Sequence, residues 1–278
     1  MKRISKISVI ILTKNEEAGI QTTLNRVNRF DDVIVVDSNS EDRTRAIAAQ
    51  HGAEITEFTW NKRYPKKKQW SLENAPIRNR WVLLLDADEY PSPGMLEELA
   101  ALQESAELDR YGAFDISLLY KFGGRFLRHG HTVTKRSLVH ADRANFPEVD
   151  DLMAPGIREV EGHYQPETGW KIGRLKSRLF HDDKDPVSSW FDRHNRYSDW
   201  EAYLRLHKAL GQTIDGKRSA RGRIFAKIPL KPAAFFLYSY LLRAGFLDGR
   251  AGFDYAIALS TYYWQIGVKT REMARVSR

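Results

Sequence analysis

A run of five apolar residues, at positions 81–85, ends abruptly in Asp86-Ala87-Asp88-Glu89. An uninterrupted apolar run of this length is typical of a strand that is buried on both faces in a parallel sheet. In open α/β sheets, ligands bind at the carboxyl ends of such strands. Residues i and i+2 of an extended chain point to the same side, so we expect Asp86 and Asp88 to project together into a ligand-binding crevice.

Two carboxylates that converge in this way repel each other unless a positive charge lies between them. A divalent cation carrying a diphosphate would supply that charge, because hard cations take oxygen ligands from carboxylates and phosphates. The alternative is that these acids only cap the helix that begins at Ser92-Pro93, a suitable N-cap and first helical residue. In both interpretations, cation binding and helix capping, residues 86–89 lie at the end of a strand.

Strand and helix patterns alternate through the first part of the chain. Apolar runs lie at residues 7–12, 33–36 and 81–85, and residues 53–58 form a weaker strand pattern. The clearest helical patterns lie at 20–27 and 40–50, the latter with Ser40 as its expected N-cap. This alternation predicts an α/β fold with a doubly wound, mostly parallel sheet. Right-handed crossovers then bring the strand ends to one edge, where we expect residues 13–16, Asp37 and residues 86–88 to meet.

Three motifs stand in order along this region: Ile10-Ile11-Leu12-Thr13-Lys14-Asn15-Glu16-Glu17, Val35-Val36-Asp37-Ser38-Asn39-Ser40-Glu41-Asp42-Arg43-Thr44 and Leu85-Asp86-Ala87-Asp88-Glu89. Together they resemble the signature of family 2 inverting glycosyltransferases of the GT-A fold, which use nucleotide-diphosphate sugars. Among these, the chain is most similar to bacterial enzymes that build lipopolysaccharide core or exopolysaccharide. The resemblance implies a Rossmann-like, mostly parallel central sheet with a small antiparallel extension. It is strong over residues 5–100 and loose beyond about residue 200.

The resemblance also implies roles for single residues in binding the nucleotide sugar. Thr13, Asn15, Glu16 and Asp37 should line the nucleoside pocket, with Asp37 near the base. The alternative for Asp37 is a loop aspartate in an Asx-turn. Lys68 is implied as a diphosphate contact, although a run of three lysines is more often a solvated face, and Trp70 stands where relatives usually have arginine.

For the metal, the resemblance implies Mg²⁺ or Mn²⁺ bound by Asp88. Asp86 should reach the ribose or a metal-bound water. His181 should complete the metal shell or touch the diphosphate, and the alternative is a structural histidine.

Inversion at the anomeric carbon requires a general base that takes the proton of the acceptor hydroxyl. The candidates are four acids within residues 147–164: Asp150, Asp151, Glu159 and Glu161. Relatives carry a glutamate at the end of a Val-His-Glu-like stretch near this place, which Val160-Glu161-Gly162-His163 matches in part. We therefore place Glu161 first and Asp151 second.

The domain organisation follows from these patterns. We expect residues 1–210 to form the GT-A domain, with a nucleotide-sugar half at 1–110 and an acceptor half at 111–210. Within the acceptor half, strands at 113–120 and 132–141 should form the antiparallel extension, with Gly123-Gly124 turning between them. An aromatic stripe predicts a helix over 186–210.

Residues 211–278 form a basic, aromatic tail. They hold 12 Lys and Arg against 4 Asp and Glu, whereas residues 1–210 hold 32 of each, so the net charge of +8 belongs to the tail. After a linker at 215–223, segments 233–242 and 255–268 read as interfacial helices on an anionic membrane surface. The alternative is a helical hairpin packed on the catalytic domain or on another subunit, which would allow a homo-oligomer.

The combined prediction is a metal-dependent inverting glycosyltransferase, peripheral on the inner face of the cytoplasmic membrane. It would move a sugar from a nucleotide-diphosphate donor, with UDP favoured, to a lipid-linked, lipopolysaccharide or exopolysaccharide glycan. Transfer to a polyprenyl phosphate and a non-catalytic nucleotide-sugar binding module are the alternatives. Nucleic-acid binding is not expected, because residues 1–210 are neutral and no recognition motif is present. The chain has no cysteine, which excludes disulfides and thiolate chemistry and favours a cytoplasmic location.

Overall fold

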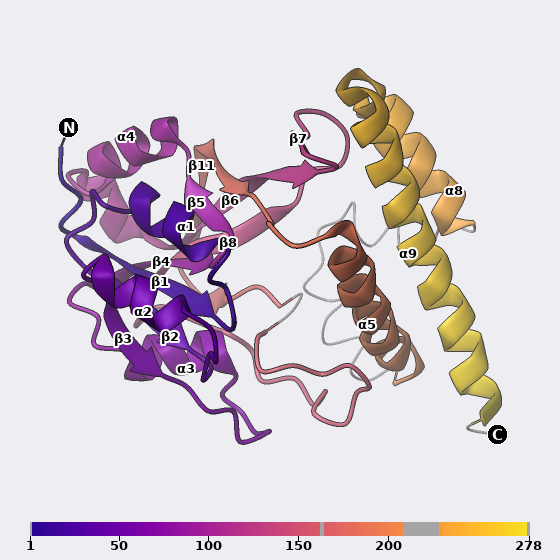
Figure 1. Ribbon diagram of the computed structural model, residues 1–278, viewed down its shortest axis with the longest axis horizontal. Helices are drawn as coiled ribbons and strands as arrows, with labels where there is room; N and C mark the ends of the chain where they lie inside the picture. Colours follow the sequence, from indigo (N-terminus) through magenta and orange to yellow (C-terminus); the bar gives the residue numbers. More distant parts are fainter. Residues whose placement is uncertain (1, 162–163, 208–227, 229, 277–278) are drawn as a thin grey trace. The chain divides into compact units, whose positions relative to one another are not determined.

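A computed structural model describes residues 2–161, 164–207, 228 and 230–276 of the chain (Figure 1). Its internal contacts divide the chain into two compact units. Unit 1 comprises Met1–Tyr120, Thr132–Glu148 and Arg158–Lys184, and unit 2 comprises Lys121–His131, Val149–Ile157 and Asp185–Arg278. The expected linker at 215–223 lies outside the described residues.

Unit 1 is an α/β unit. Its elements along the chain are β1 (Ile7–Thr13), α1 (Ile20–Arg26), β2 (Val33–Asp37), α2 (Thr44–Gln50), β3 (Glu54–Glu57), α3 (Lys67–Asn74), β4 (Trp81–Asp86), β5 (Glu89–Pro91), α4 (Pro93–Leu102), the 3₁₀ helix η1 (Ala106–Arg110), β6 (Tyr111–Phe122), β8 (Thr134–His140), β9 (Ala144–Asn145), β10 (Glu167–Thr168) and β11 (Lys171–His181).

The strands form one large mixed sheet in the order β3-β2-β1-β4-β8-β6-β11-β5. Strands β3, β2, β1 and β4 are parallel, β8 runs antiparallel to both β4 and β6, and β11 is parallel to β6 and antiparallel to β5. This confirms the predicted α/β fold with a mostly parallel half and an antiparallel extension. The extension continues the same sheet, and Gly123-Gly124 leads first into β7 (Arg125–Phe126), which pairs with the end of β6.

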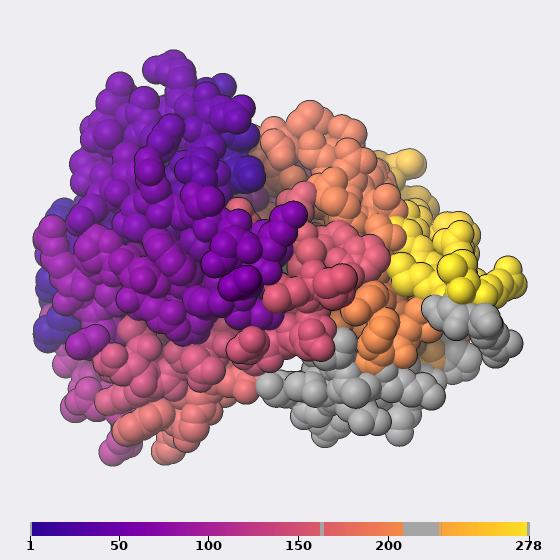
Figure 2. Space-filling model, turned by 90° about the horizontal axis from the view of Figure 1, so that it is seen from below, coloured from indigo at the N-terminus to yellow at the C-terminus, as the bar shows by residue number. Residues whose placement is uncertain are grey.

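Both faces of the parallel half are buried. On β4, Leu83 and Leu85 belong to one core cluster, while Val82 and Leu84 belong to the other. Residues of α1, α2 and α4 join the first cluster, and Leu72 of α3 joins the second. Residues of this half, indigo to purple, form a closely packed surface in Figure 2. The continuous apolar runs of the sequence therefore have the cause that we expected, burial on both sides.

Two predicted helix starts have different outcomes. Ser92 is the N-cap of α4, and its Oγ accepts a hydrogen bond from the Met95 amide at 3.2 Å, as predicted. The prediction that Ser40 is the N-cap of α2 was wrong, because the helix begins at Thr44 with Arg43 as its N-cap. The Ser40 hydroxyl donates instead to Asp37 Oδ2 at 2.5 Å, because the carboxylate at the end of β2 competes for it.

Unit 2 is mainly helical. Besides β7 it contains α5 (Val187–Leu206), α8 (Lys231–Phe236), the π-helical turn η2 (Leu237–Leu242), the 3₁₀ turn η3 (Gly245–Asp248) and α9 (Gly249–Val276). A core cluster joins Phe122, Leu127 and Trp190 to Tyr255 and Ala258 of α9. Because α5 packs on α9, this grouping differs from the boundary expected at residue 210. Among the described residues, no helix is long and apolar enough to cross a bilayer.

His131 makes the stability of unit 2 depend on pH. Burial and, to a smaller extent, Arg243 lower the pKa of His131 to about 4. The unfolded chain, with an ordinary histidine pKa near ~6.5, therefore binds more protons below that pH, and stability should fall as pH falls from about 6.5 to 4. Because the ring is only partly buried, we expect a loss of about 2 kcal/mol. Urea unfolding of His131→Gln across this range should lack that part of the slope; an unchanged slope would contradict the assignment.

Candidate functional site

The expected site residues of the first two motifs meet at one edge of the sheet. Thr13, the last residue of β1, pairs in register with Asp37 at the end of β2. On the other side of β1, Leu12 pairs with Asp86 at the end of β4. Because the three strands are parallel, their carboxyl ends lie side by side. This is where a ligand binds in open α/β sheets.

Asp37 is buried and holds the loops after β1 and β2 together. Its Oδ2 accepts a hydrogen bond from Thr13 Oγ1 at 2.7 Å, and its Oδ1 accepts from the Ser40 amide at 2.7 Å. The Ser40 Oγ in turn accepts from the Asn15 amide at 2.8 Å. The Glu16 amide donates to Thr44 Oγ1 at 2.8 Å. The structure thus brings Thr13, Asn15 and Asp37 into one polar network, and Glu16 lies beside it, bonded to the first residue of α2.

Lys67 is a buried lysine that the sequence analysis did not single out. Its Nζ donates to the Thr13 carbonyl oxygen at 2.7 Å and to Ser38 Oγ at 2.6 Å, and lies 3.5 Å from Glu159 Oε1. Burial lowers the pKa of Lys67, while Glu159 and Asp37 oppose that shift. A buried ammonium beside the ends of β1 and β2 adds a fixed positive charge at this edge.

Lys68 and Glu161 lie at the start of α3. The Lys68 Nζ is 3.9 Å from Asp86 Oδ1, so its positive charge lies beside the acidic residues at the end of β4. The Glu161 carboxylate accepts hydrogen bonds from the Lys68 and Gln69 amides at 2.8 and 3.0 Å. The side chain is 0% exposed, and burial raises its pKa. Glu161 as placed therefore caps the amino terminus of α3, whose own N-cap residue makes no side-chain hydrogen bond.

Removing this cap should destabilise the protein. We expect Glu161→Ala to lower the free energy of unfolding by about 1–3 kcal/mol, because two buried amides lose their acceptor. Glu161→Gln, which keeps one acceptor oxygen, should lose less, and urea unfolding measures both. Equal stability of the alanine variant and the parent would contradict the capping role.

Asp151, the second candidate base, lies in unit 2. Its Oδ2 accepts a hydrogen bond from Trp200 Nε1 at 2.9 Å, and the side chain is 0% exposed. The assignment of the general base to Glu161 or Asp151 stays a prediction.

A second cluster surrounds Lys135 of β8. The Lys135 Nζ lies 2.7 Å from Asp86 Oδ2 and 2.8 and 2.7 Å from the two oxygens of Glu89. Glu89 is 1% exposed. Although burial acts against both charged forms, the attraction between the groups lowers the pKa of Asp86 and raises that of Lys135. Lys135 is therefore a fixed cation within the acidic cluster.

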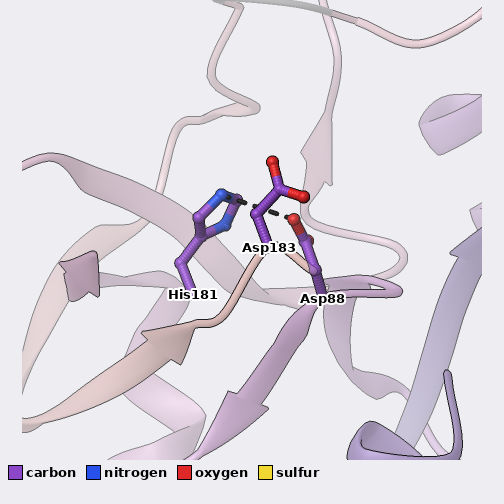
Figure 3. A group of neighbouring side chains, drawn as sticks. All are labelled: Asp88, His181 and Asp183. Carbon is purple, nitrogen blue, oxygen red and sulfur yellow. Dashed lines mark ion pairs between the residues drawn. The ribbon is translucent and has the colours of Figure 1, made fainter. Parts of the chain in front are cut away.

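Asp88, His181 and Asp183 form the candidate metal centre (Figure 3). One ligand atom from each lies within 4.8 Å of the other two. His181 Nε2 is 3.4 Å from Asp88 Oδ2, and His181 Nδ1 is 3.5 Å from Glu89 Oε1. These side chains come from the turn after β4, the end of β11 and the residues just after it. Two carboxylate oxygens and one imidazole nitrogen suit Mn²⁺.

Charge repulsion favours a cation at this centre. Burial raises the pKa of Asp88 to about 6, with His181 opposing and the carboxylates of Glu89, Asp86 and Asp183 adding to the rise. Burial acts to lower the pKa of His181, but Asp88 and Glu89 raise it to about 9. The residues present thus fit a divalent metal by ligand type and by charge.

The expected geometry of the acidic motif is only partly realised. Residues 87 and 88 form a turn between β4 and β5, so Asp86 and Asp88 do not follow one another along an extended strand. Asp86 faces Lys135, whereas Asp88 faces His181. Asp86 as a direct metal ligand stays a prediction, and in the structure its charge partner is Lys135. Asp183, two residues after His181, belongs to the candidate metal centre.

The comparisons with known proteins show the family of the chain. The model for the family "Glycosyl transferase family 2" matches residues 8–160, which is more than half of the chain, and the chain therefore belongs to this family.

Relatives match only parts of the chain closely. An uncharacterized glycosyltransferase of Rickettsia bellii is 41% identical over 115 residues, which are 41% of this chain and 38% of the relative. The chain thus spans about two fifths of that relative's length. Among solved structures, a mannosyltransferase of Pyrobaculum calidifontis in complex with GDP-Man and Mn²⁺ is similar over 95% of this chain and 86% of its own, with 15% identity and a TM-score of 0.49. Glucosyl-3-phosphoglycerate synthase of Mycobacterium tuberculosis in complex with Mg²⁺ and UDP is 26% identical over 43% of this chain and 45% of its own, with a TM-score of 0.33.

Proposed function

We propose that the protein is a metal-dependent inverting glycosyltransferase that uses a nucleotide-diphosphate sugar, with UDP as the favoured nucleotide. The observation that carries this proposal is the meeting of the Asp37 network and the Asp88–His181–Asp183 centre at the ends of parallel strands in unit 1. Family membership supports the same chemistry.

In this proposal the two clusters divide the donor between them. The network of Thr13, Asn15 and Asp37, with Glu16 beside it, holds the nucleoside, and Lys68 contacts the diphosphate. Asp88, His181 and Asp183 hold Mn²⁺ or Mg²⁺. The metal, when bound, stabilises the charge that develops on the leaving diphosphate.

Lys135 has a different role from the metal ligands. Its ammonium offsets part of the negative charge of Asp86 and Glu89, and thereby fixes the Asp86 carboxylate beside the strand ends. This leaves Asp86 positioned for the ribose of the donor. A general base completes the reaction by taking the proton of the acceptor hydroxyl.

Glu161 and Asp151 are the proposed bases, and substitution tests both. If Glu161 is the base, Glu161→Gln retains donor binding and loses turnover, while its fold stays intact. Full turnover of that variant would exclude Glu161 as the general base and leave Asp151 and Glu159 as candidates. The variants Asp151→Asn and Glu159→Gln are then compared in the same assay.

For the acceptor we propose a lipid-linked, lipopolysaccharide or exopolysaccharide glycan, with the protein peripheral on the inner face of the cytoplasmic membrane. The basic residues of the tail support this location, because positive charge favours binding to anionic headgroups.

The test is thermal unfolding of the full chain with UDP, GDP or TDP, each with and without Mn²⁺. A ligand present at 100 times its Kd stabilises the native state by about 2.7 kcal/mol. We expect one nucleotide to stabilise the protein, and to do so only with the metal. Stabilisation by no nucleotide would contradict the donor site, and slow metal-dependent hydrolysis of the corresponding nucleotide sugar would separate an enzyme from a binding module.

A further inference from the structure

The turn between α8 and α9 carries a patch of exposed apolar side chains. We call the segment from η2 to the start of α9, residues 237–250, the hairpin tip. Six apolar residues of the tip are between 40% and 79% exposed: Leu237, Tyr238, Leu241, Leu242, Phe246 and Leu247. In Figure 1 this segment lies at the end where α8 and α9 join.

The tip is a tightly built turn. The Arg243 amide donates to the Tyr238 carbonyl at 2.8 Å, and the Leu247 amide donates to the Ala244 carbonyl at 3.0 Å. A Cβ added at Gly245 would lie 2.8 Å from the Ser239 carbonyl oxygen, so only glycine fits this approach. The exposed leucines are therefore held in place on a defined backbone.

The loop that follows β7 is tied to the tip by hydrogen bonds. The His129 amide donates to Asp248 Oδ2 at 2.8 Å, and the Gly130 amide donates to the Arg243 carbonyl at 2.8 Å. This fixes exposed Arg125 and Arg128 in the same part of unit 2 as the tip.

Charge at the tip is positive. The exposed charged residues here include Arg125, Arg128, Arg243 and Arg250. The side chain of Asp248 is buried, with 2% exposure, and Asp254 pairs with Arg250 at 2.9 Å. Exposed apolar side chains surrounded by arginine match the two parts of an anionic bilayer, its acyl chains and its headgroups. A hydrophobic surface for a second copy of this chain would instead place the same arginines against each other.

We propose that the hairpin tip, with the adjoining Arg125 and Arg128, is the surface by which this protein docks on anionic lipid membranes. The face of α9 that carries Tyr255, Tyr262 and Ile266 packs within unit 2, so this face of the helix is not available to a bilayer. This narrows the membrane location proposed above to one surface, and it does not depend on sugar transfer.

Vesicle co-sedimentation of the full chain, without donor or acceptor, tests the proposal. The parent should bind vesicles of phosphatidylcholine with phosphatidylglycerol, and bind phosphatidylcholine alone much more weakly. Arg125→Gln with Arg128→Gln should weaken binding about 25-fold, since each basic residue near the surface contributes about fivefold. Leu242→Ser with Phe246→Ser should weaken binding at least tenfold, because the variant loses the free energy gained by burying part of two large apolar side chains in the bilayer. All four substituted positions are exposed, and thermal unfolding checks that the variants fold.

Arg271→Gln with Arg275→Gln is the matched control, because these arginines are exposed at the other end of α9. It should bind within about twofold of the parent, since the two arginines lie more than a Debye length of about 10 Å from the tip along a helix of this length. Equal loss in the control pair, binding of the parent to neither vesicle, or unchanged binding of the tip variants would overturn the proposal. A tip variant that becomes monomeric from an oligomeric parent, with vesicle binding unchanged, would assign the tip to self-association instead.

Discussion

Replacing Asp88 with asparagine should abolish the stabilisation of the protein by UDP and Mn²⁺. In the parent, this pair at 100 times its Kd should add about 2.7 kcal/mol to the free energy of unfolding, and in the variant less than about 0.5 kcal/mol. Asparagine lacks the charge that attracts the cation, while His181 and Asp183 remain. Thermal unfolding with and without ligands measures both proteins.

Without ligands, the same variant should be at least as stable as the parent. Asp88 lies among the carboxylates of Glu89, Asp86 and Asp183, and burial disfavours its charged form at neutral pH. Asparagine removes that repulsion. If Asp88 only held the fold together, the ligand-free variant would be less stable than the parent; if Asp88 serves to bind a metal, it would not be. Asp142→Asn is the control, because Asp142 pairs only with exposed Arg80 at 3.1 Å in the described structure. Retained stabilisation by UDP and Mn²⁺ in the Asp88 variant would exclude Asp88 as a ligand.

Replacing Lys135 with methionine should destabilise the protein by about 3–5 kcal/mol, the usual cost of leaving a buried charge without its partner. Methionine has a similar length and fills the space without a charge. Glu89, at 1% exposure, and Asp86 would then face each other, with Lys68 at 3.9 Å from Asp86 and His181 at 3.5 Å from Glu89 as the nearby cations. Urea unfolding measures the loss.

A double-mutant cycle separates the charge interaction from packing. Glu89→Gln alone should also destabilise, but Lys135→Met with Glu89→Gln should lose less than the two single losses combined, because the pair is removed together. Lys176→Met, on the exposed surface of β11, should change stability by no more than about 0.5 kcal/mol. Additive losses would show that Lys135 and Glu89 do not interact.

The parallel half of the fold could be predicted from the sequence because its signals are local. The apolar runs of β1, β2 and β4 become strands buried on both faces, and parallel pairing then places Thr13, Asp37 and Asp86 at one edge. No long-range contact has to be known for these steps. The same holds for Ser92, whose side chain caps the helix that it begins.

The charge partners of the site could not be predicted, because they depend on pairing between distant strands. Lys135 meets Asp86 only because β8 lies antiparallel beside β4, and Glu89 meets His181 because β5 pairs with β11. In the sequence, Lys135 is one of several basic residues on a predicted strand, and Glu89 is the last acid of a motif. Nothing local distinguishes either one from a solvated side chain.

The helical part could be predicted only in outline, for a related reason. Aromatic residues at helical spacing predicted the helix at 186–210 but not its neighbour. The structure packs α5 on α9, and α9 extends from Gly249 to Val276, well beyond the expected 255–268. Sequence periodicity shows that a helix has an apolar face, and does not show which helix covers it.

The position of β11 has a consequence for dividing this protein into fragments. The family match ends at residue 160, but β11 lies between β6 and β5 in the sheet and carries His181 at its end. A fragment that stops where the match stops would keep every acidic residue of the third motif and lose the imidazole, Asp183 and the strand on which β5 is aligned. Such a fragment would be recognised by its sequence as a family member, although it would lack two of the three proposed metal ligands. The proposed metal centre is therefore complete only after the chain has been synthesised beyond Asp183.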